Sequence, residues 1–128
     1  MNKKMDNGLS KQQLEIIREI LAPFADRIDR VDLFGSRAQG THRPNSDIDL
    51  VLRGDIDKKA TDRLWTLFAE SSLALKVDVL AYAQITKAAL KKHIDLVSVP
   101  LFTKADLIHD KSGRNSDIRP DSGSLGLD

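Results

Sequence analysis

Two carboxylates stand one residue apart in Asp47-Ile48-Asp49, at the start of an otherwise apolar run. Because strand side chains alternate between two faces, Asp47 and Asp49 are expected on one face and Ile48 on the other. Two carboxylates that close repel each other, and one stays protonated unless a cation intervenes. Carboxylate oxygens suit Mg²⁺, which typically binds one or two carboxylates together with substrate phosphates. The pair therefore predicts a magnesium site.

A third carboxylate, Asp78, interrupts the apolar segment "KVDVL" in a similar way. If the strands that carry Asp49 and Asp78 are neighbours, Asp78 completes a triad with Asp47 and Asp49. Three acids on one sheet make sense as a seat for one or two metal ions in phosphoryl-type transfer. The plainer alternatives are strand-end turn acids for the pair and an edge acid facing solvent for Asp78.

Gly35 and Ser36 precede the paired acids by a short spacer and follow an apolar segment. Without a Cβ, the backbone at Gly35 can approach a ligand closely, and free N–H groups at a helix start attract phosphate. The Ser36 hydroxyl adds a donor. Arg37 and Arg43 are candidates to pair with phosphate oxygens, and for both the alternative is an ordinary surface charge.

The elements that must position these residues follow from hydrophobic periodicity. A helix is expected from Ser10, which has capping-box spacing to Gln13, and Pro23 should end it. Strands are expected over 30–34, 47–52 and 73–82, with a short edge strand over 97–102, because Pro100 would interrupt a central ladder. One helical turn is expected over 36–40, and longer helices over 57–72 and 85–96.

The resulting order, α-β-β-α-β-α-β, predicts an α/β (α+β) domain with a small mixed sheet of about four strands flanked by helices. This domain is expected to cover residues 1–110. Residues 111–128 are rich in Gly, Ser and Asp, lack periodicity and are expected to form a disordered tail.

The composition limits the classes of function. The chain has 128 residues, which suits one domain. Lys plus Arg total 20 and Asp plus Glu total 19, and the net charge of +1 gives no electrostatic reason to expect direct binding of nucleic acid. There is no cysteine, and the sequence has neither a signal-peptide pattern nor an apolar run long enough for a membrane helix. The cytoplasm is the expected location.

The segment "GSRAQGTHRPNSDIDL", followed later by "VDV", resembles the nucleotidyltransferase superfamily that includes DNA polymerase beta. Its signature is Gly-Ser, a spacer of about this length, Asp-x-Asp, and a later lone Asp on a strand. The sequence is most similar to the minimal nucleotidyltransferase subfamily, MNT. Its members form one half of a toxin–antitoxin pair with an all-helical HEPN protein, often a ribonuclease.

The resemblance implies attack of a hydroxyl on the α-phosphate of ATP and release of pyrophosphate. Asp47 and Asp49 would hold Mg²⁺ and the triphosphate, and Asp78 would bind a second Mg²⁺ and help to deprotonate the acceptor. Gly35 and Ser36 would hold the outer phosphates. Family members transfer AMP to a tyrosine of the HEPN toxin, so this chain is expected to be its antitoxin.

Two other functions stay open on the sequence alone. The chain could neutralise its partner by binding and occlusion, with transfer incidental, or it could modify a small molecule such as an aminoglycoside. The second alternative would need dimerisation to build an acceptor pocket. Base selectivity, the acceptor residue, the number of AMP units and the oligomeric state are not decided by the sequence.

Overall fold

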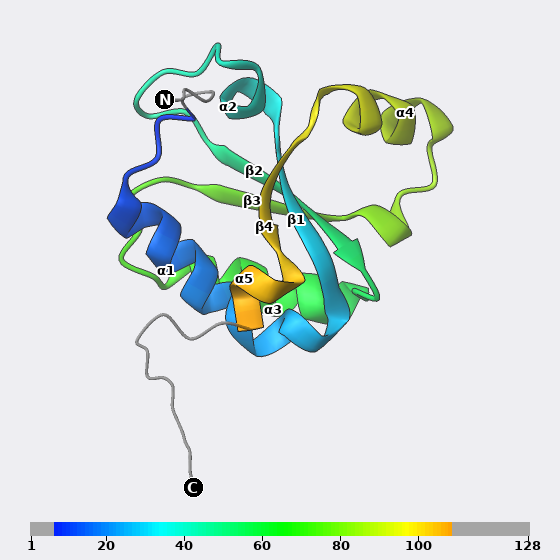
Figure 1. The fold of residues 1–128 in the computed structure, drawn as a ribbon, viewed down its shortest axis with the longest axis horizontal. Helices are drawn as coiled ribbons and strands as arrows, with labels where there is room; N and C mark the ends of the chain where they lie inside the picture. The colour runs from blue at the N-terminus through cyan, green and yellow to red at the C-terminus, as the bar shows by residue number, and fades with distance from the viewer. Residues whose placement is uncertain (1–6, 109–128) are drawn as a thin grey trace, which may run out of the picture.

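The computed structural model describes residues 7–108 of the chain (Figure 1). In order, this part of the chain forms α1 (Lys11–Leu21), the 3-10 helix η1 (Ala22–Arg27), β1 (Ile28–Phe34), α2 (Gly35–Gln39), β2 (Ile48–Gly54), α3 (Lys58–Ala69), β3 (Val77–Ala81), the 3-10 helix η2 (Tyr82–Gln84), α4 (Ala88–Val97), β4 (Val99–Thr103) and α5 (Lys104–Ile108). The four strands form a single mixed sheet in the spatial order β3-β2-β1-β4. This confirms the predicted fold class and element order.

The pairing of the strands determines which side chains meet. Strand β2 is antiparallel to β1 and parallel to β3, and β4 is antiparallel to β1. A parallel pair needs a crossover connection, which α3 provides between β2 and β3. As expected, the Pro-containing strand β4 lies at an edge of the sheet, where Pro100 interrupts no central ladder.

Helix α1 begins where the capping-box spacing predicts. The Ser10 hydroxyl accepts a hydrogen bond from the Gln13 backbone N–H at 3.0 Å, and the Gln13 side chain accepts one from the Ser10 N–H at 2.9 Å. The α-helix ends at Leu21, and Pro23 lies within the 3-10 turn that follows. Proline was therefore a correct sign of the boundary, although the chain continues in a tighter helical form.

One face of the sheet carries the hydrophobic core. Buried side chains of α1, α3 and the strands form this core: Ile17, Leu21, Val31, Leu33, Ile48, Leu50, Leu52, Leu64, Phe68, Val77 and Val79 are among them. Two further buried hydrophobic residues, Val51 of β2 and Ile94 of α4, lie outside this cluster. Since Val51 alternates with Leu50 and Leu52, it points to the opposite face, part of which α4 covers.

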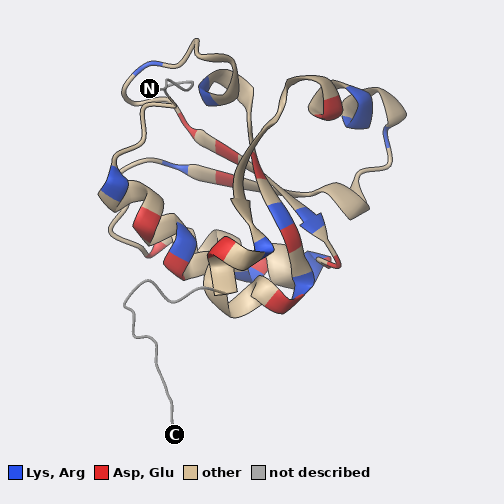
Figure 2. Ribbon diagram, in the orientation of Figure 1, with Lys and Arg blue, Asp and Glu red and all other residues tan. Residues whose placement is uncertain are grey.

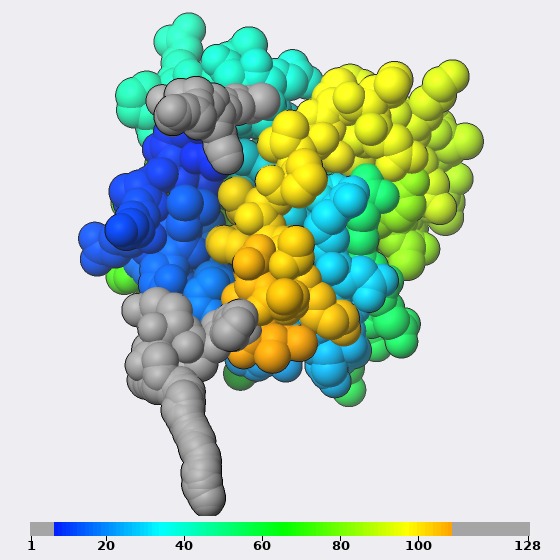
Figure 3. All heavy atoms as spheres, viewed as in Figure 1, coloured from blue at the N-terminus to red at the C-terminus, as the bar shows by residue number. Residues whose placement is uncertain are grey.

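Figure 3 shows α2 and the loop after it at one end of the molecule and α5 at the other. The short helix α5 is not among the elements expected from the sequence. The predicted domain end at 110 and the predicted tail over 111–128 lie outside the described residues. None of the helices between residues 7 and 108 is both long and apolar enough to cross a bilayer.

Candidate functional site

Asp49 and Asp78 lie at the same register position of the adjacent parallel strands β2 and β3. Both are half-buried on the face opposite the core, because Ile48, Leu50, Val77 and Val79 on either side of them are buried in it. Figure 2 shows the acidic segments of the two strands next to each other. The strands that carry Asp49 and Asp78 are therefore neighbours in the sheet, as predicted.

The electrostatics of this pair favour a cation. The pKa of Asp49 is raised from the ordinary 3.8 to about 6, first by burial and then by the charge of Asp78 and a hydrogen bond with it. Asp47 adds a smaller effect in the same direction, while Lys76 opposes it. A divalent ion would replace this repulsion between like charges by attraction, so the donor set fits a hard cation such as Mg²⁺.

The closed triad expected from the sequence is not formed by the side chains as they stand. Asp47 precedes the first residue of β2 and is exposed. Within residues 7–108, no three Asp, Glu or His side chains are grouped to hold one metal ion. The reason is that Asp49 and Asp78 belong to the strand ladder, whereas Asp47 belongs to the loop before it.

Lys76 is a neighbour of the carboxylates that lies outside the sequence motif. Its Nζ lies 3.7 Å from Asp78 Oδ1, and its side chain is 61% exposed. Sequence spacing contained the signal, because residues 76 and 78 of a strand-like segment face the same way. The ammonium group partly balances the charge of the acidic pair.

The Gly35–Ser36 turn, at the start of α2, lies directly against Asp49. Gly35 has φ +73°, and a Cβ at this position would collide with Asp49 Oδ2. On the strand side, Phe34 is the register partner of Asp49 across β1 and β2. Glycine is therefore required both by backbone conformation and by the approach of the carboxylate. The first and second parts of the sequence motif therefore lie side by side at Gly35 and Asp49.

The two arginine candidates differ sharply. Arg43 is exposed, as a residue that binds a ligand from solvent would be. Arg37 is fully buried, and its guanidinium donates to backbone carbonyls of Asn7, Pro44 and Ser46. The expectation that Arg37 pairs with phosphate does not agree with this geometry, because the side chain does not reach the surface and is bound to the protein backbone.

A second network of charges occupies the same face of the sheet, on β1, β2 and α4. Asp32, with 1% of its side chain exposed, accepts hydrogen bonds from Arg30 Nε at 2.7 Å and Arg53 Nε at 2.7 Å. Arg53 continues to Asp95 on α4 at 3.0 Å, and Asp95 accepts a hydrogen bond from the Tyr82 hydroxyl at 2.9 Å. Arg53 and Tyr82 lower the pKa of Asp95 through these hydrogen bonds. The network ties α4 to the sheet.

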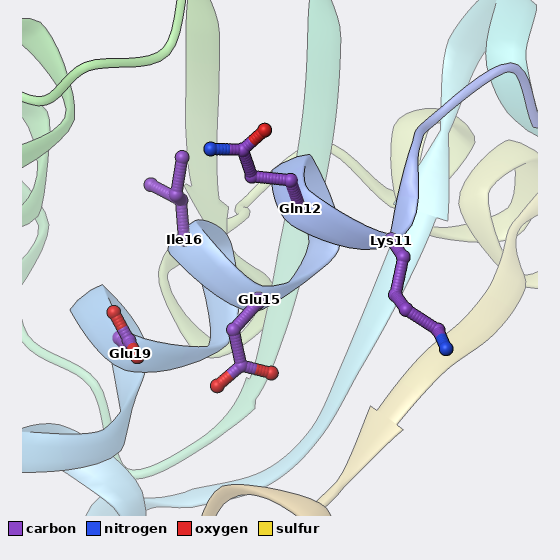
Figure 4. Close-up of a pocket in the computed structure, with 5 residues that line it drawn as sticks. All are labelled: Lys11, Gln12, Glu15, Ile16 and Glu19. Atoms are coloured by element: carbon purple, nitrogen blue, oxygen red, sulfur yellow. The ribbon is translucent and has the colours of Figure 1, made fainter.

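A surface hollow unrelated to these residues runs along α1 (Figure 4). It is lined by Lys11, Gln12, Glu15, Ile16 and Glu19. None of the predicted site residues lines it. The carboxylate pair therefore remains the candidate for chemistry.

A mixed sheet with paired carboxylates on adjacent strands, next to the glycine that begins α2, suits the binding of a divalent cation. The sequence profile described as "Nucleotidyltransferase domain" matches residues 11–107. The chain belongs to this family and is an enzyme of the transferase class. The match extends from the start of α1 into α5.

One relative is the "Probable protein adenylyltransferase MntA" of Haemophilus influenzae. It is 35% identical over 77 residues, which are 59% of this chain and 67% of the relative. Solved structures with the same fold include one described as "the toxin-antitoxin with AMP-PNP", with a TM-score of 0.59, 24% identity, and coverage of 74% of this chain and 80% of the other. Another is "the toxin-antitoxin MntA-HepT", with a TM-score of 0.55, 18% identity, and coverage of 77% and 80%.

Proposed function

We propose that this enzyme transfers AMP from ATP to a hydroxyl group of a helical HEPN toxin. The acceptor is the hydroxyl of a tyrosine, and the transfer makes this chain the antitoxin. Support comes from the MntA relative, which is named as a protein adenylyltransferase. The toxin–antitoxin structures with this fold, one of them with AMP-PNP, also support it. The use of ATP as donor agrees with a reaction in the cytoplasm.

The observation that carries the proposal is the Asp49–Asp78 register pair beside Gly35. Two carboxylates held together on adjacent strands, with the pKa of Asp49 raised to about 6, are costly unless they bind a cation. Asp49, Asp78 and the loop residue Asp47 would hold Mg²⁺, one or two ions. When bound, Mg²⁺ supplies charge neutralisation for the triphosphate.

The chain's own residues then have separate tasks. Backbone N–H groups at the Gly35–Ser36 turn, the Ser36 hydroxyl and exposed Arg43 would orient the outer phosphates. The acceptor oxygen forms a bond to the α-phosphorus while the bond to the β-phosphate oxygen breaks, and pyrophosphate leaves. Asp78 would accept the proton of the acceptor hydroxyl. Catalysis of this kind is mainly positioning and electrostatics.

The test is incubation of the protein with ATP, Mg²⁺ and a HEPN toxin, followed by intact mass measurement of the toxin. Transfer should add one or more adenylyl units, and Asp49→Asn should abolish the gain. Asp62→Asn is the matched control, since Asp62 is an exposed acid of α3 whose carboxylate pairs with Lys58. No mass gain with wild-type enzyme would overturn the proposal.

The same variants, tested in cells, distinguish neutralisation by binding alone from neutralisation by AMP transfer. If Asp49→Asn still suppresses the toxin as wild type does, binding alone neutralises the partner. If suppression is lost while the complex still forms, transfer is the neutralising step.

A further inference from the structure

Arg37 joins two segments of the site through its side chain. It follows the Gly35–Ser36 turn directly and reaches the loop that leads into Asp47. Its Nη2 donates to Ser46 O at 3.0 Å and Pro44 O at 3.2 Å, and its Nε donates to Ser46 O at 3.3 Å. A single guanidinium therefore holds the backbone next to the first acid of the motif.

The same side chain also holds a third segment. Its Nη1 donates to the carbonyl of Asn7 at 2.8 Å, in the chain before α1. A guanidinium offers donors in a fixed, planar fork, so one side chain can bind several carbonyls in different directions. Lysine has a single nitrogen at its end and cannot reproduce this pattern.

The loop held by Arg37 is itself a closed turn. The Arg43 N–H donates to Ser46 Oγ at 2.7 Å, and the Ser46 N–H donates to Arg43 O at 3.0 Å. These two hydrogen bonds close the 43–46 turn on itself, and the bonds from Arg37 link the turn to α2.

The three acids depend to different degrees on the hydrogen bonds that Arg37 makes to the 43–46 turn. Asp49 and Asp78 are placed by the ladder between β2 and β3. Asp47 lies before the ladder begins, and the N–H of its neighbour Ile48 donates to Lys76 O at 2.9 Å. The position of Asp47 is thus set from one side by the sheet and from the other by Ser46, which Arg37 holds.

We propose that Arg37 is a positioning residue that places Asp47 for metal binding and does not contact the nucleotide. The inference rests on the proposed function, because it assumes that Asp47 is a ligand. It explains why a fully buried arginine lies one residue after the turn that would bind phosphate. Loss of groups that orient a metal ligand typically weakens metal binding by roughly 10- to 100-fold.

The experiment measures Mn²⁺ binding by calorimetry on the whole protein without nucleotide, so that it does not depend on transfer. Arg37→Met should weaken binding at least about tenfold. Arg53→Met is the control, because Arg53 is also mostly buried and ion-paired but lies in the Asp32–Asp95 network. It should lower stability without a comparable loss of Mn²⁺ affinity.

A double-mutant cycle separates positioning from general damage. If Arg37 acts through Asp47, Arg37→Met should add little to the loss of Mn²⁺ affinity already caused by Asp47→Asn. Equal losses in the presence and absence of Asp47 would overturn the positioning role. Arg37→Lys replaces Arg37→Met throughout if circular dichroism shows the latter unfolded, and an intermediate loss of affinity is then expected.

Two failures are distinguishable. Wild type that binds Mn²⁺ no more tightly than Arg37→Met would overturn the role of Arg37 alone. Wild type that binds no Mn²⁺ would overturn the proposed metal site, and with it the positioning role.

Discussion

The carboxylate of Asp49 occupies the space in which a side chain at position 35 would begin. A Cβ on Gly35 would collide with Asp49 Oδ2, and the Gly35 backbone has φ +73°. The first element of the sequence motif and the second are thus in direct contact. The segment between them, which is the rest of α2 and the loop after it, brings its two ends back together.

Gly35→Ala is expected to reduce the proposed AMP transfer strongly. The positive φ alone costs about 1 kcal/mol of stability, and displacement of Asp49 by about 1 Å would lower the rate by roughly 100-fold. Gly40→Ala is the matched control, since Gly40 has φ +78° but a Cβ added to it would meet nothing within 4 Å. Urea denaturation should show a stability loss for both variants, larger for Gly35→Ala because its Cβ collides with Asp49, and initial rates should fall only for Gly35→Ala.

The pair of acids should make stability depend on pH. The pKa of Asp49 is about 6 in the folded protein, against 3.8 ordinarily. Between these two pKa values the folded state keeps the proton of Asp49 and the unfolded state loses it. The contribution of Asp49 to the free energy of unfolding is therefore complete below about pH 4 and is lost as the pH rises through about 6. Asp49→Asn should therefore be more stable than wild type at pH 8, by about 1 kcal/mol after allowance for solvent screening.

At pH 4 the same comparison should show almost no difference. Urea denaturation of both proteins with a chelator present, at pH 4 and pH 8, measures the two differences directly. An Asp49→Asn effect that is the same at both pH values would contradict a raised pKa at this site.

Divalent ions should stabilise the folded protein through the same residues. A ligand at 100 times its dissociation constant adds about 2.7 kcal/mol to the free energy of unfolding. Mg²⁺ or Mn²⁺ should therefore raise the melting temperature of wild type at pH 8, and Asp78→Asn should remove most of that increase. Asp62→Asn should respond as wild type does. Equal increases in Asp78→Asn and wild type would place the ion elsewhere.

The buried carboxylate of Asp32 should be important for stability rather than for chemistry. Asp32→Ala leaves Arg53 without its main partner, and loss of one member of a buried ion pair costs about 3 kcal/mol or more. Asp62→Ala removes an exposed pair with Lys58 and should change stability by less than about 0.5 kcal/mol. Chemical denaturation measures both. A similar, small effect for both variants would show that Asp32 contributes little.

Much of the fold could be predicted because local signals agree with the tertiary structure. Ser10 and Gln13 cap α1 as their spacing indicates, and the alternation of Asp49 with Ile48 and Leu50 gives the correct faces of β2. One missed element had a signal of the same kind. Thr103 and Asp106 bond reciprocally at the start of α5, at 2.9 and 3.2 Å, and their spacing is that of a capping box.

The candidate site was less predictable where it depends on distant segments. The register that places Asp78 beside Asp49 cannot be predicted from the sequence of either strand alone. The burial of Arg37 depends on Asn7 and on the 43–46 loop, which no local pattern connects to it. The role of a single arginine near a motif therefore cannot be read from the sequence. A buried arginine that binds backbone carbonyls and an exposed arginine that binds a ligand look the same there.

The crossover from β2 through α3 to β3 has a consequence during synthesis. Parallel pairing joins segments that are distant in sequence and forms only after the connection between them has closed. A growing chain that has emerged only to the end of β2 already contains Gly35, Asp47 and Asp49 but lacks β3, which carries Asp78. The pair of Asp49 and Asp78 can therefore form only after β3 has left the ribosome.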